Sequence, residues 1–220
     1  EIPLILVGDS ASMVVYGYST TIPVTMDEML LVVKAVVRGS KKALIVADMP
    51  FLSYQSSSKE AILNAGKLIK EGGAGAVKLE GGKHMKNHIE NLVKIGIPVM
   101  GHVGLTPQSY HQLSGYSMQG KTPKTAQTII DDALAVQEAG AFCVVLECIP
   151  SDLAKKITSI LSIPTIGIGS GQNCDGQIQV FHDVLGLSNS TPPKHAMQYK
   201  KLNVDISEAL QKYKSAVEKF

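Results

Sequence analysis

Short apolar runs alternate with longer amphipathic segments along most of the chain. Six of the runs show little polar alternation, which is typical of strands that are buried on both faces of a parallel sheet. These runs are residues 3–7, 43–47, 74–79, 97–100, 142–146 and 164–168. Residues 177–183 do alternate between polar and apolar side chains, and this pattern predicts either a seventh strand or a short helix.

The segments between the strands carry signals for the starts and ends of helices. Thr25 and Glu28 have the spacing of a capping box, which predicts a helix over 26–38. Similar signals predict helices over 58–71, 123–138 and 152–161, with Ser57, Thr122 and Ser151 as their respective caps. The repeated order of strand and helix implies right-handed crossovers and a parallel sheet.

Two architectures have this order, a (β/α)8 TIM barrel and an open doubly wound sheet. Seven strands do not suit a closed barrel, and the chain enters its first strand within three residues. We therefore expect an α/β fold of the (β/α)8 TIM barrel type that lacks the first strand–helix unit in this chain.

We expect one barrel domain over residues 1–187, because no linker or low-complexity stretch divides the repeating units. A segment rich in Pro and Ser follows at 188–194. Beyond it, apolar side chains at positions 206, 210, 213, 217 and 220 share one face of a helix. Residues 188–220 are thus expected to form a linker and a C-terminal helix that packs on the barrel or on a neighbouring subunit.

Composition and charge exclude several classes of partner. Charged residues make up only 18% of the chain, against about 25% in typical globular domains, so other copies of the chain are expected to cover part of the surface. The net charge of +2 offers no electrostatic footprint for nucleic acid or a membrane face. Cys143, Cys148 and Cys174 form no CxxC pair, which predicts a reduced, cytoplasmic protein.

Each predicted strand delivers a polar or ionisable residue at its carboxyl end, where active sites lie in barrels and open α/β sheets. In strand order these residues are Asp9 and Ser10, Asp48, Lys78 and Glu80, His102, Glu147, and Ser170. Carboxylates gathered in one cavity repel one another and take up protons, and a hard divalent cation such as Mg²⁺ removes that repulsion. The alternative is a structural ion pair between Lys78 and Glu80, which share one strand face.

Other candidates are weaker. His84 and His88 are four residues apart, but the Glu of a metalloprotease motif is missing between them, so a solvated helix face is expected. The glycines at 167, 169 and 171 predict a loop that lets the backbone approach a ligand, or only a tight turn. His102 is either a core histidine with satisfied hydrogen bonds or a ligand.

Several short motifs resemble those of the ketopantoate hydroxymethyltransferase family, in the same order from residue 5 to about residue 187. They are VGDS at 7–10, DMPF at 48–51, VKLEGG at 77–82, GHVGLTPQ at 101–108, LEC at 146–148, GIGSG at 167–171 and DGQ at 175–177. The resemblance implies an enzyme of pantothenate biosynthesis that uses Mg²⁺ and 5,10-methylenetetrahydrofolate to convert 3-methyl-2-oxobutanoate to 2-dehydropantoate through a Mg²⁺-stabilised enolate. It also implies a homo-oligomer, commonly a decamer.

Carried over residue by residue, the resemblance implies roles for the strand-end residues. Metal ligands fall on Asp9, Asp48 and Glu80; keto-acid contacts on Asp9, Ser10, Asp48 and Lys78; the proton acceptor on Glu147; and a substrate-pocket histidine on His102. Two other interpretations stay open. One is a Mg²⁺-enolate lyase or mutase of the phosphoenolpyruvate type, which needs more cationic phosphate contacts than Lys78 supplies. The other is a non-catalytic binding or scaffold barrel, since fold alone does not separate these functions.

Overall fold

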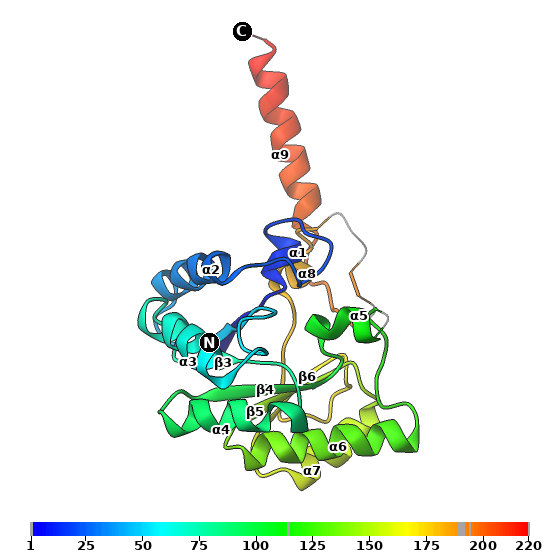
Figure 1. Ribbon diagram of the computed structural model, residues 1–220. Helices are drawn as coiled ribbons and strands as arrows, with labels where there is room; N and C mark the ends of the chain where they lie inside the picture. Colours follow the sequence, from blue (N-terminus) through cyan, green and yellow to red (C-terminus); the bar gives the residue numbers. More distant parts are fainter. Residues whose placement is uncertain (1, 114, 189–191, 194, 220) are drawn as a thin grey trace. The chain divides into compact units, whose positions relative to one another are not determined.

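The computed structural model describes the chain except for residues 1, 114, 189–191, 194 and 220 (Figure 1). The described residues fall into two compact units, Glu1–Gln177 and Ile178–Phe220. The second unit holds α8 (Phe181–Leu185) and α9 (Leu202–Val217). It begins at residue 178, ten residues before the start expected at residue 188. The packing of the C-terminal helix on the barrel or on a neighbour stays a prediction.

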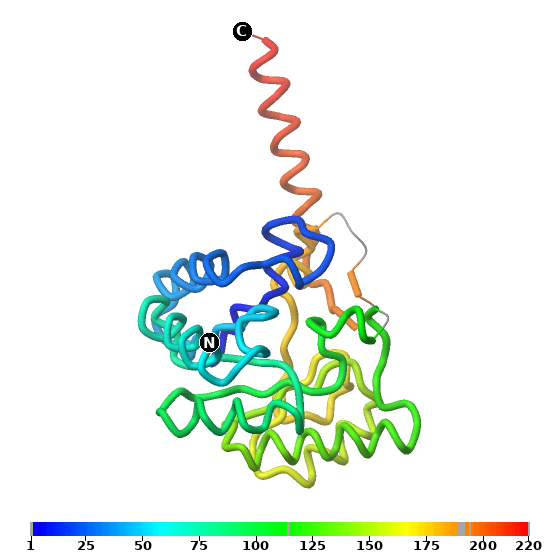
Figure 2. Tube along the Cα trace, viewed as in Figure 1, coloured from blue at the N-terminus to red at the C-terminus, as the bar shows by residue number. Residues whose placement is uncertain are grey.

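The first unit is built on one parallel sheet in which every strand pairs with the strand that follows it in the chain. The strands are β1 (Leu4–Val7), β2 (Leu44–Asp48), β3 (Ala76–Lys78), β4 (Val99–Gly104), β5 (Cys143–Glu147), β6 (Thr165–Ile168) and β7 (Gly176–Gln177). The colours in Figure 2 accordingly pass in order from blue to yellow across this unit. A doubly wound sheet reverses its strand order, so the unbroken order is that of a (β/α) barrel with one strand fewer than eight, which confirms the expected fold class.

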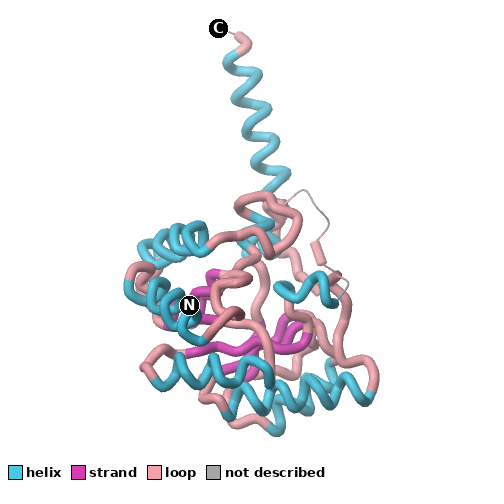
Figure 3. Tube along the Cα trace, in the orientation of Figure 1, coloured by secondary structure: helices cyan, strands magenta, loops and turns pink. Residues whose placement is uncertain are grey.

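Helices connect the strands and lie around them (Figure 3). They are α1 (Ala11–Val14), α2 (Met26–Gly39), α3 (Ser58–Lys70), η1 (Lys83–Met85), α4 (Lys86–Lys94), η2 (Pro107–Ser109), α5 (Tyr110–Leu113), α6 (Pro123–Glu138) and α7 (Ser151–Ile160). The segment 177–183 contains both expected alternatives, because β7 ends at Gln177 and α8 begins at Phe181.

The helix caps follow the sequence signals in three of four cases. The capping box of Thr25 and Glu28 is present in both directions, and the side chains of Ser57 and Thr122 cap α3 and α6. The expectation for Ser151 is wrong. Ser151 is the first residue of α7 and caps nothing; its hydroxyl instead accepts a hydrogen bond from Asn173 Nδ2 at 3.1 Å.

The alternation of side chains along the strands divides the apolar residues between two cores. The larger core lies between the strands and the helices, and it includes Ile45 and Ala47 of β2. The smaller one is formed by residues of or beside the strands, with Val46, Ala76, Met100, Cys143 and Val145 as its buried members. A step of two residues beyond these positions keeps the same face of the sheet. That step leads to Asp48, Lys78, His102 and Glu147, so these polar side chains share the face of the smaller core at the carboxyl ends of the strands.

Candidate active site

The centre of the polar group is an ion pair between neighbouring strands. Asp48 ends β2 and Lys78 ends β3, and the two residues are direct partners in the register of the sheet. Lys78 Nζ lies 2.9 Å from Asp48 Oδ1. Both residues are almost fully buried, at 1% and 3% exposure. Strand pairing therefore sets this contact, and the low exposure isolates it from water.

Two further carboxylates lie around the same ammonium group. The backbone N–H of Asp9, just beyond β1, donates to Asp48 Oδ2 at 3.0 Å. Glu80, two residues beyond Lys78, has its Oε1 atom 4.0 Å from Lys78 Nζ. That oxygen is buried and accepts no hydrogen bond from any described residue. The site thus holds three buried carboxyl groups beside one ammonium.

Burial and mutual repulsion change the proton affinities of these groups. Burial, with the charges of Asp48 and Glu80 added, raises the pKa of Asp9 well above its ordinary value. Burial also raises the pKa of Asp48, although Lys78 opposes the shift. For Lys78 burial acts to lower the pKa, but the surrounding carboxylates outweigh it and the pKa is raised. Lys78 therefore keeps its charge at neutral pH, while the carboxylates remain in excess.

His102 joins this cluster to Glu147, the last residue of β5. Its Nε2 lies 3.1 Å from Glu147 Oε2, and its Nδ1 lies 3.6 Å from Glu80 Oε1 and 3.3 Å from Lys78 Nζ. Burial and the charge of Lys78 act to lower the pKa of His102, but the carboxylates of Glu147 and Glu80 outweigh them and raise it to about 9. His102 therefore lies between two carboxylates and an ammonium group, unlike a core histidine with neutral partners.

Gln108 in η2 and Tyr54 before α3 belong to the site, although the sequence analysis gave them no role. The Gln108 side-chain amide donates to Asp9 Oδ2 at 3.0 Å, and its backbone N–H donates to Glu80 Oε2 at 3.0 Å. The hydroxyl of Tyr54 donates to Gln108 Oε1 at 2.7 Å and accepts from the Glu80 N–H at 3.0 Å. The position of Gln108 in the motif at 101–108 was the available signal; Tyr54 lies in a loop without one.

Ser10 is placed beside the cluster by Gly8. A Cβ at Gly8 would lie 3.1 Å from Ser10 Oγ and 3.9 Å from Asp48 Oδ2, so the missing side chain leaves space between a hydroxyl and a carboxylate. Ser10 precedes α1 without capping it by its side chain. The structure therefore brings together all the strand-end residues assigned to the site from the sequence, with Ser10 at its rim.

The donor set suits a hard divalent cation. Carboxylate oxygens are the ligands that Mg²⁺ prefers, and it commonly takes only one or two of them. Asp9 and Asp48 are tied by a backbone hydrogen bond beside the space at Gly8, and Glu80 Oε1 lacks a hydrogen bond. Within the described residues, no three His, Cys, Asp or Glu side chains are arranged to hold a metal ion together. The three-carboxylate ligand set stays a prediction.

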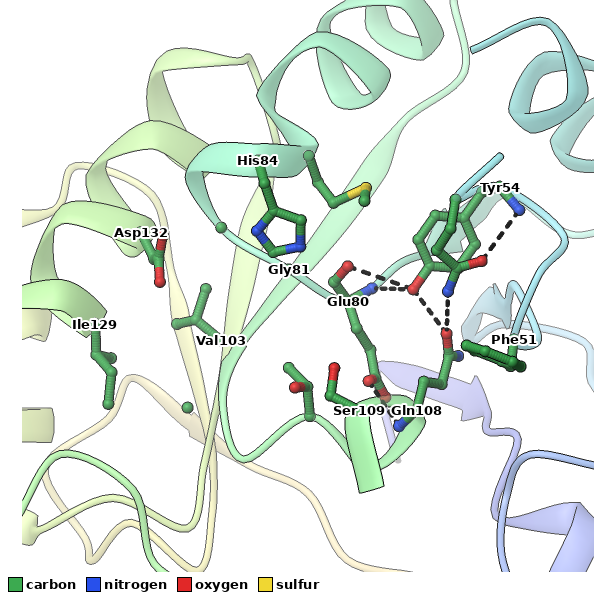
Figure 4. Close-up of a pocket in the computed structure, with 15 residues that line it drawn as sticks. Phe51, Tyr54, Glu80, Gly81, His84, Val103, Gln108, Ser109, Ile129 and Asp132 are labelled. Carbon is green, nitrogen blue, oxygen red and sulfur yellow. Dashed lines mark hydrogen bonds between the residues drawn. The ribbon is translucent and has the colours of Figure 1, made fainter. Parts of the chain in front are cut away.

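A pocket of about 160 Å³ lies beside the carboxylates (Figure 4). Glu80, Gln108 and Tyr54 form one side of it, joined by hydrogen bonds, and His84 and Asp132 line it from η1 and α6. Whole small-molecule ligands usually occupy roughly 300–1,000 Å³, so this space is small. Among the described residues that line it, Glu80 is the only carboxylate of the cluster.

The two weaker candidates from the sequence, the histidine pair and the glycine-rich loop, lie in surroundings that indicate a structural role. His84 is exposed as expected, whereas His88 is half-buried, and both its ring nitrogens are buried without hydrogen-bond partners among the described residues. The glycine-rich loop after β6 contains left-handed turns, with φ of 64° at Gly169 and 81° at Gly171. A Cβ at Gly171 would meet Ser151 Oγ at 2.2 Å. Close packing against α7 thus explains that glycine, as expected of a tight turn.

Residues 1–220 match the family model of ketopantoate hydroxymethyltransferase. The chain is 59% identical over 210 residues to the 3-methyl-2-oxobutanoate hydroxymethyltransferase of Carboxydothermus hydrogenoformans, with 96% of this chain and 76% of the relative covered. It is 56% identical over 218 residues to the enzyme of the same name from Dehalococcoides mccartyi, with coverage of 99% and 78%.

The fold also resembles a solved structure of low sequence similarity. A putative phosphonomutase from Burkholderia cenocepacia superimposes with a TM-score of 0.59 at 12% identity, over 99% of this chain and 86% of that one. At this identity the likeness concerns the fold alone. Among the described residues, no helix has the length and apolar character needed to cross a membrane.

Proposed function

Because this chain belongs to the ketopantoate hydroxymethyltransferase family, we propose that it transfers a hydroxymethyl group from 5,10-methylenetetrahydrofolate to 3-methyl-2-oxobutanoate. The product is 2-dehydropantoate, a precursor in pantothenate biosynthesis. The observation that supports this proposal is the buried group of Asp9, Asp48 and Glu80 around Lys78, with the His102–Glu147 pair beside it. It combines a hard-cation donor set, a fixed positive charge and a carboxylate base.

The acidic residues supply the metal site. Asp9 and Asp48 would hold Mg²⁺, with Glu80 as the further ligand, since Glu80 Oε1 is free of hydrogen bonds from the described residues. When bound, Mg²⁺ supplies Lewis-acid chemistry, which polarises the keto and carboxylate oxygens of the substrate and acidifies its C3–H bond.

Lys78 and Ser10 orient the keto acid. The charge that Lys78 keeps at neutral pH attracts the substrate carboxylate, and the Ser10 hydroxyl donates to it from the rim. Orientation of this kind turns a bimolecular step into an effectively unimolecular one.

Glu147 removes the proton from C3. The C3–H bond breaks, the proton passes to a Glu147 carboxylate oxygen, and the bonding pair moves into the enolate. His102 Nε2 lies 3.1 Å from Glu147 Oε2, so His102 orients the carboxylate that takes the proton. The enolate carbon then bonds to the folate one-carbon unit as the first of its two C–N bonds breaks. The hydroxyl of a water molecule replaces the second nitrogen on that carbon, and the proton held by Glu147 and the remaining water proton pass to the two nitrogens of the departing tetrahydrofolate.

Exchange of the C3 hydrogen with solvent deuterium tests the proposal without folate. We expect 3-methyl-2-oxobutanoate to exchange in the presence of the protein and Mg²⁺, and to stop exchanging when the metal is chelated. Product formation should then require 5,10-methylenetetrahydrofolate. A protein that catalyses no exchange with Mg²⁺ would contradict the enolate mechanism. Exchange with no product on addition of the folate would instead favour another Mg²⁺-enolate reaction.

A further inference from the structure

Gln108 is buried at the meeting point of two carboxyl groups that come from different strands. It is 5% exposed, and it is separated from Asp9 by 99 residues and from Glu80 by 28. Its side-chain Nε2 donates to Asp9 Oδ2 at 3.0 Å, and its backbone N–H donates to Glu80 Oε2 at 3.0 Å. One residue thus links the carboxylate after β1 to the carboxylate after β3.

The amide of Gln108 has a single orientation that satisfies its surroundings. Its Nε2 gives both hydrogens away, to Asp9 and to the backbone carbonyl of Met49 at 2.9 Å. Its Oε1 accepts from Tyr54 at 2.7 Å and from Gln55 Nε2 at 2.9 Å. A flipped amide would set its oxygen against a carboxylate and a carbonyl, and its NH₂ against the Gln55 NH₂. Four hydrogen bonds therefore hold the donor toward Asp9.

Tyr54 completes this arrangement from the other side. Its ring is fully buried, and its hydroxyl contacts Gln108 Oε1 and the backbone N–H of Glu80. Glu80 is consequently fixed at its backbone by Tyr54 and at its carboxylate by Gln108.

We propose that Gln108 is a positioning residue for the metal site, which holds Asp9 and Glu80 at the separation and orientation that the cation requires. This inference rests on the proposed function, since it assigns Asp9 and Glu80 to Mg²⁺. Each carboxylate keeps one oxygen on Gln108 and leaves its other oxygen for the cation. Partners that orient metal ligands in this way typically change metal affinity or activity by roughly 10–100-fold when they are removed.

Gln108→Met tests the proposal, because it preserves length and removes both donors to Asp9 and Met49. We expect calorimetric titration with Mg²⁺ and keto acid to show an affinity for Mg²⁺ that is weaker by roughly 10–100-fold. Deuterium exchange should need correspondingly more Mg²⁺ for its half-maximal rate, and should recover toward the parent rate when Mg²⁺ is saturating. Loss of structure alone would not produce this recovery.

Gln137→Met is the matched control. Gln137 also accepts several hydrogen bonds, from Ser162 N at 2.6 Å, Ser162 Oγ at 3.0 Å and Ile163 N at 3.3 Å, but it contacts no residue of the site. We expect this variant to lose thermal stability and to keep the parent's affinity for Mg²⁺. If Gln108→Met binds Mg²⁺ as tightly as Gln137→Met does, the positioning role is wrong.

Tyr54→Phe carries the test if Gln108→Met does not fold. It keeps the buried ring and removes only the hydroxyl that orients the Gln108 amide, so a smaller loss of Mg²⁺ affinity in the same direction is expected. An unchanged affinity would overturn the proposal. A parent protein that binds no Mg²⁺ and exchanges no deuterium would instead contradict the proposed function itself, so the two failures are distinguishable.

Discussion

Lys78 Nζ and Asp48 Oδ1 lie 2.9 Å apart on neighbouring strands, in a place that water does not reach. The Asp9 carboxylate has no such cationic partner at this distance among the described residues, and it instead accepts a hydrogen bond from the Gln108 amide at 3.0 Å. The two aspartates are therefore unequal, although the sequence analysis treated them as one group of mutually repelling carboxylates.

This inequality predicts opposite effects on stability in metal-free buffer. We expect Asp48→Asn to lower the free energy of unfolding by roughly 3–5 kcal/mol, because it leaves the buried Lys78 charge with less compensation. Asp9→Asn should leave stability unchanged or raise it, because burial already disfavours the ionised form of Asp9. Urea unfolding of both variants measures the difference. Both should also bind Mg²⁺ more weakly and lose turnover; equal destabilisation would contradict the ion-pair assignment.

Glu147→Gln should separate binding from proton transfer. The amide preserves shape and cannot accept the C3 proton, so we expect keto acid and Mg²⁺ to bind while deuterium exchange falls by a factor of about 10²–10⁴, the usual contribution of a general base. The measurement is exchange followed by NMR, with binding followed by calorimetry. Exchange at the parent rate would show that another group takes the proton. His102 would then be the next candidate, because its Nε2 lies 3.1 Å from Glu147 Oε2.

Gly104 should be indispensable at the end of β4. Its φ is +95°, and a Cβ there would lie 2.4 Å from the carbonyl oxygen of Glu147. Gly96 offers a matched control, since its φ is +89° but no atom lies within 4 Å of its Cβ position. We expect Gly96→Ala to cost roughly 1–2 kcal/mol from backbone strain alone. Gly104→Ala should cost more and should also slow exchange by displacing Glu147. Equal costs in urea unfolding would show that the close approach is unimportant.

Cys143 should make stability fall at alkaline pH. Burial raises the pKa of its thiol to about 12, whereas the unfolded chain loses that proton near pH ~8.5. The folded state then holds the extra proton, so its contribution to stability is complete below pH ~8.5 and declines as the pH rises, by at most about 1.4 kcal/mol per unit.

Cys143→Ala removes this contribution. We expect its free energy of unfolding to fall less steeply than the parent's when urea unfolding is repeated from pH 8 to 10. Val145→Ala is the control, because Val145 lies in the same smaller core and carries no titratable group. The dependence of its unfolding free energy on pH should equal the parent's. Equal slopes in all three proteins would contradict the prediction.

Self-association is a further expectation from the sequence. On α9, the side chains of Ile206, Leu210, Tyr213 and Val217 are exposed in the single chain. Phe220, the fifth position of the predicted apolar face, lies outside the described residues. Closed symmetric assemblies are the usual way to cover such a face. We propose that the chain self-associates, and we expect light scattering to give a mass that is a multiple of 23.5 kDa. Leu210→Glu should lower this mass, whereas the control Gln211→Glu on the same helix should not. A parent mass near 23.5 kDa would contradict self-association.

The strand-end residues were predictable because each follows directly on a buried apolar run, and a step of two residues keeps a side chain on one face of the sheet. The contacts of Gln108 were not, because they join segments 99 and 28 residues apart and depend on where η2 folds back over β1 and β3. The expectation that Ser151 caps α7 failed for a local reason. Pro150 occupies the N-cap position, so Ser151 is the first residue inside the helix. The half-burial of His88 was not predictable either, because the spacing of two histidines gives no measure of how far each ring is exposed.

Every strand of the sheet pairs with the strand that follows it in the chain. When a new strand leaves the ribosome, the strand with which it pairs has therefore already been synthesised. The polar network has a different timing, because Asp9 and Asp48 are made long before Gln108 orients them and before Glu147 exists. A nascent chain that ends after β3 carries the acidic residues and Lys78 without the base. The strand order thus allows each strand pair to form as soon as its second strand has been synthesised. The active site, in contrast, is complete only after β5 has been synthesised, because Glu147 is the last residue of that strand.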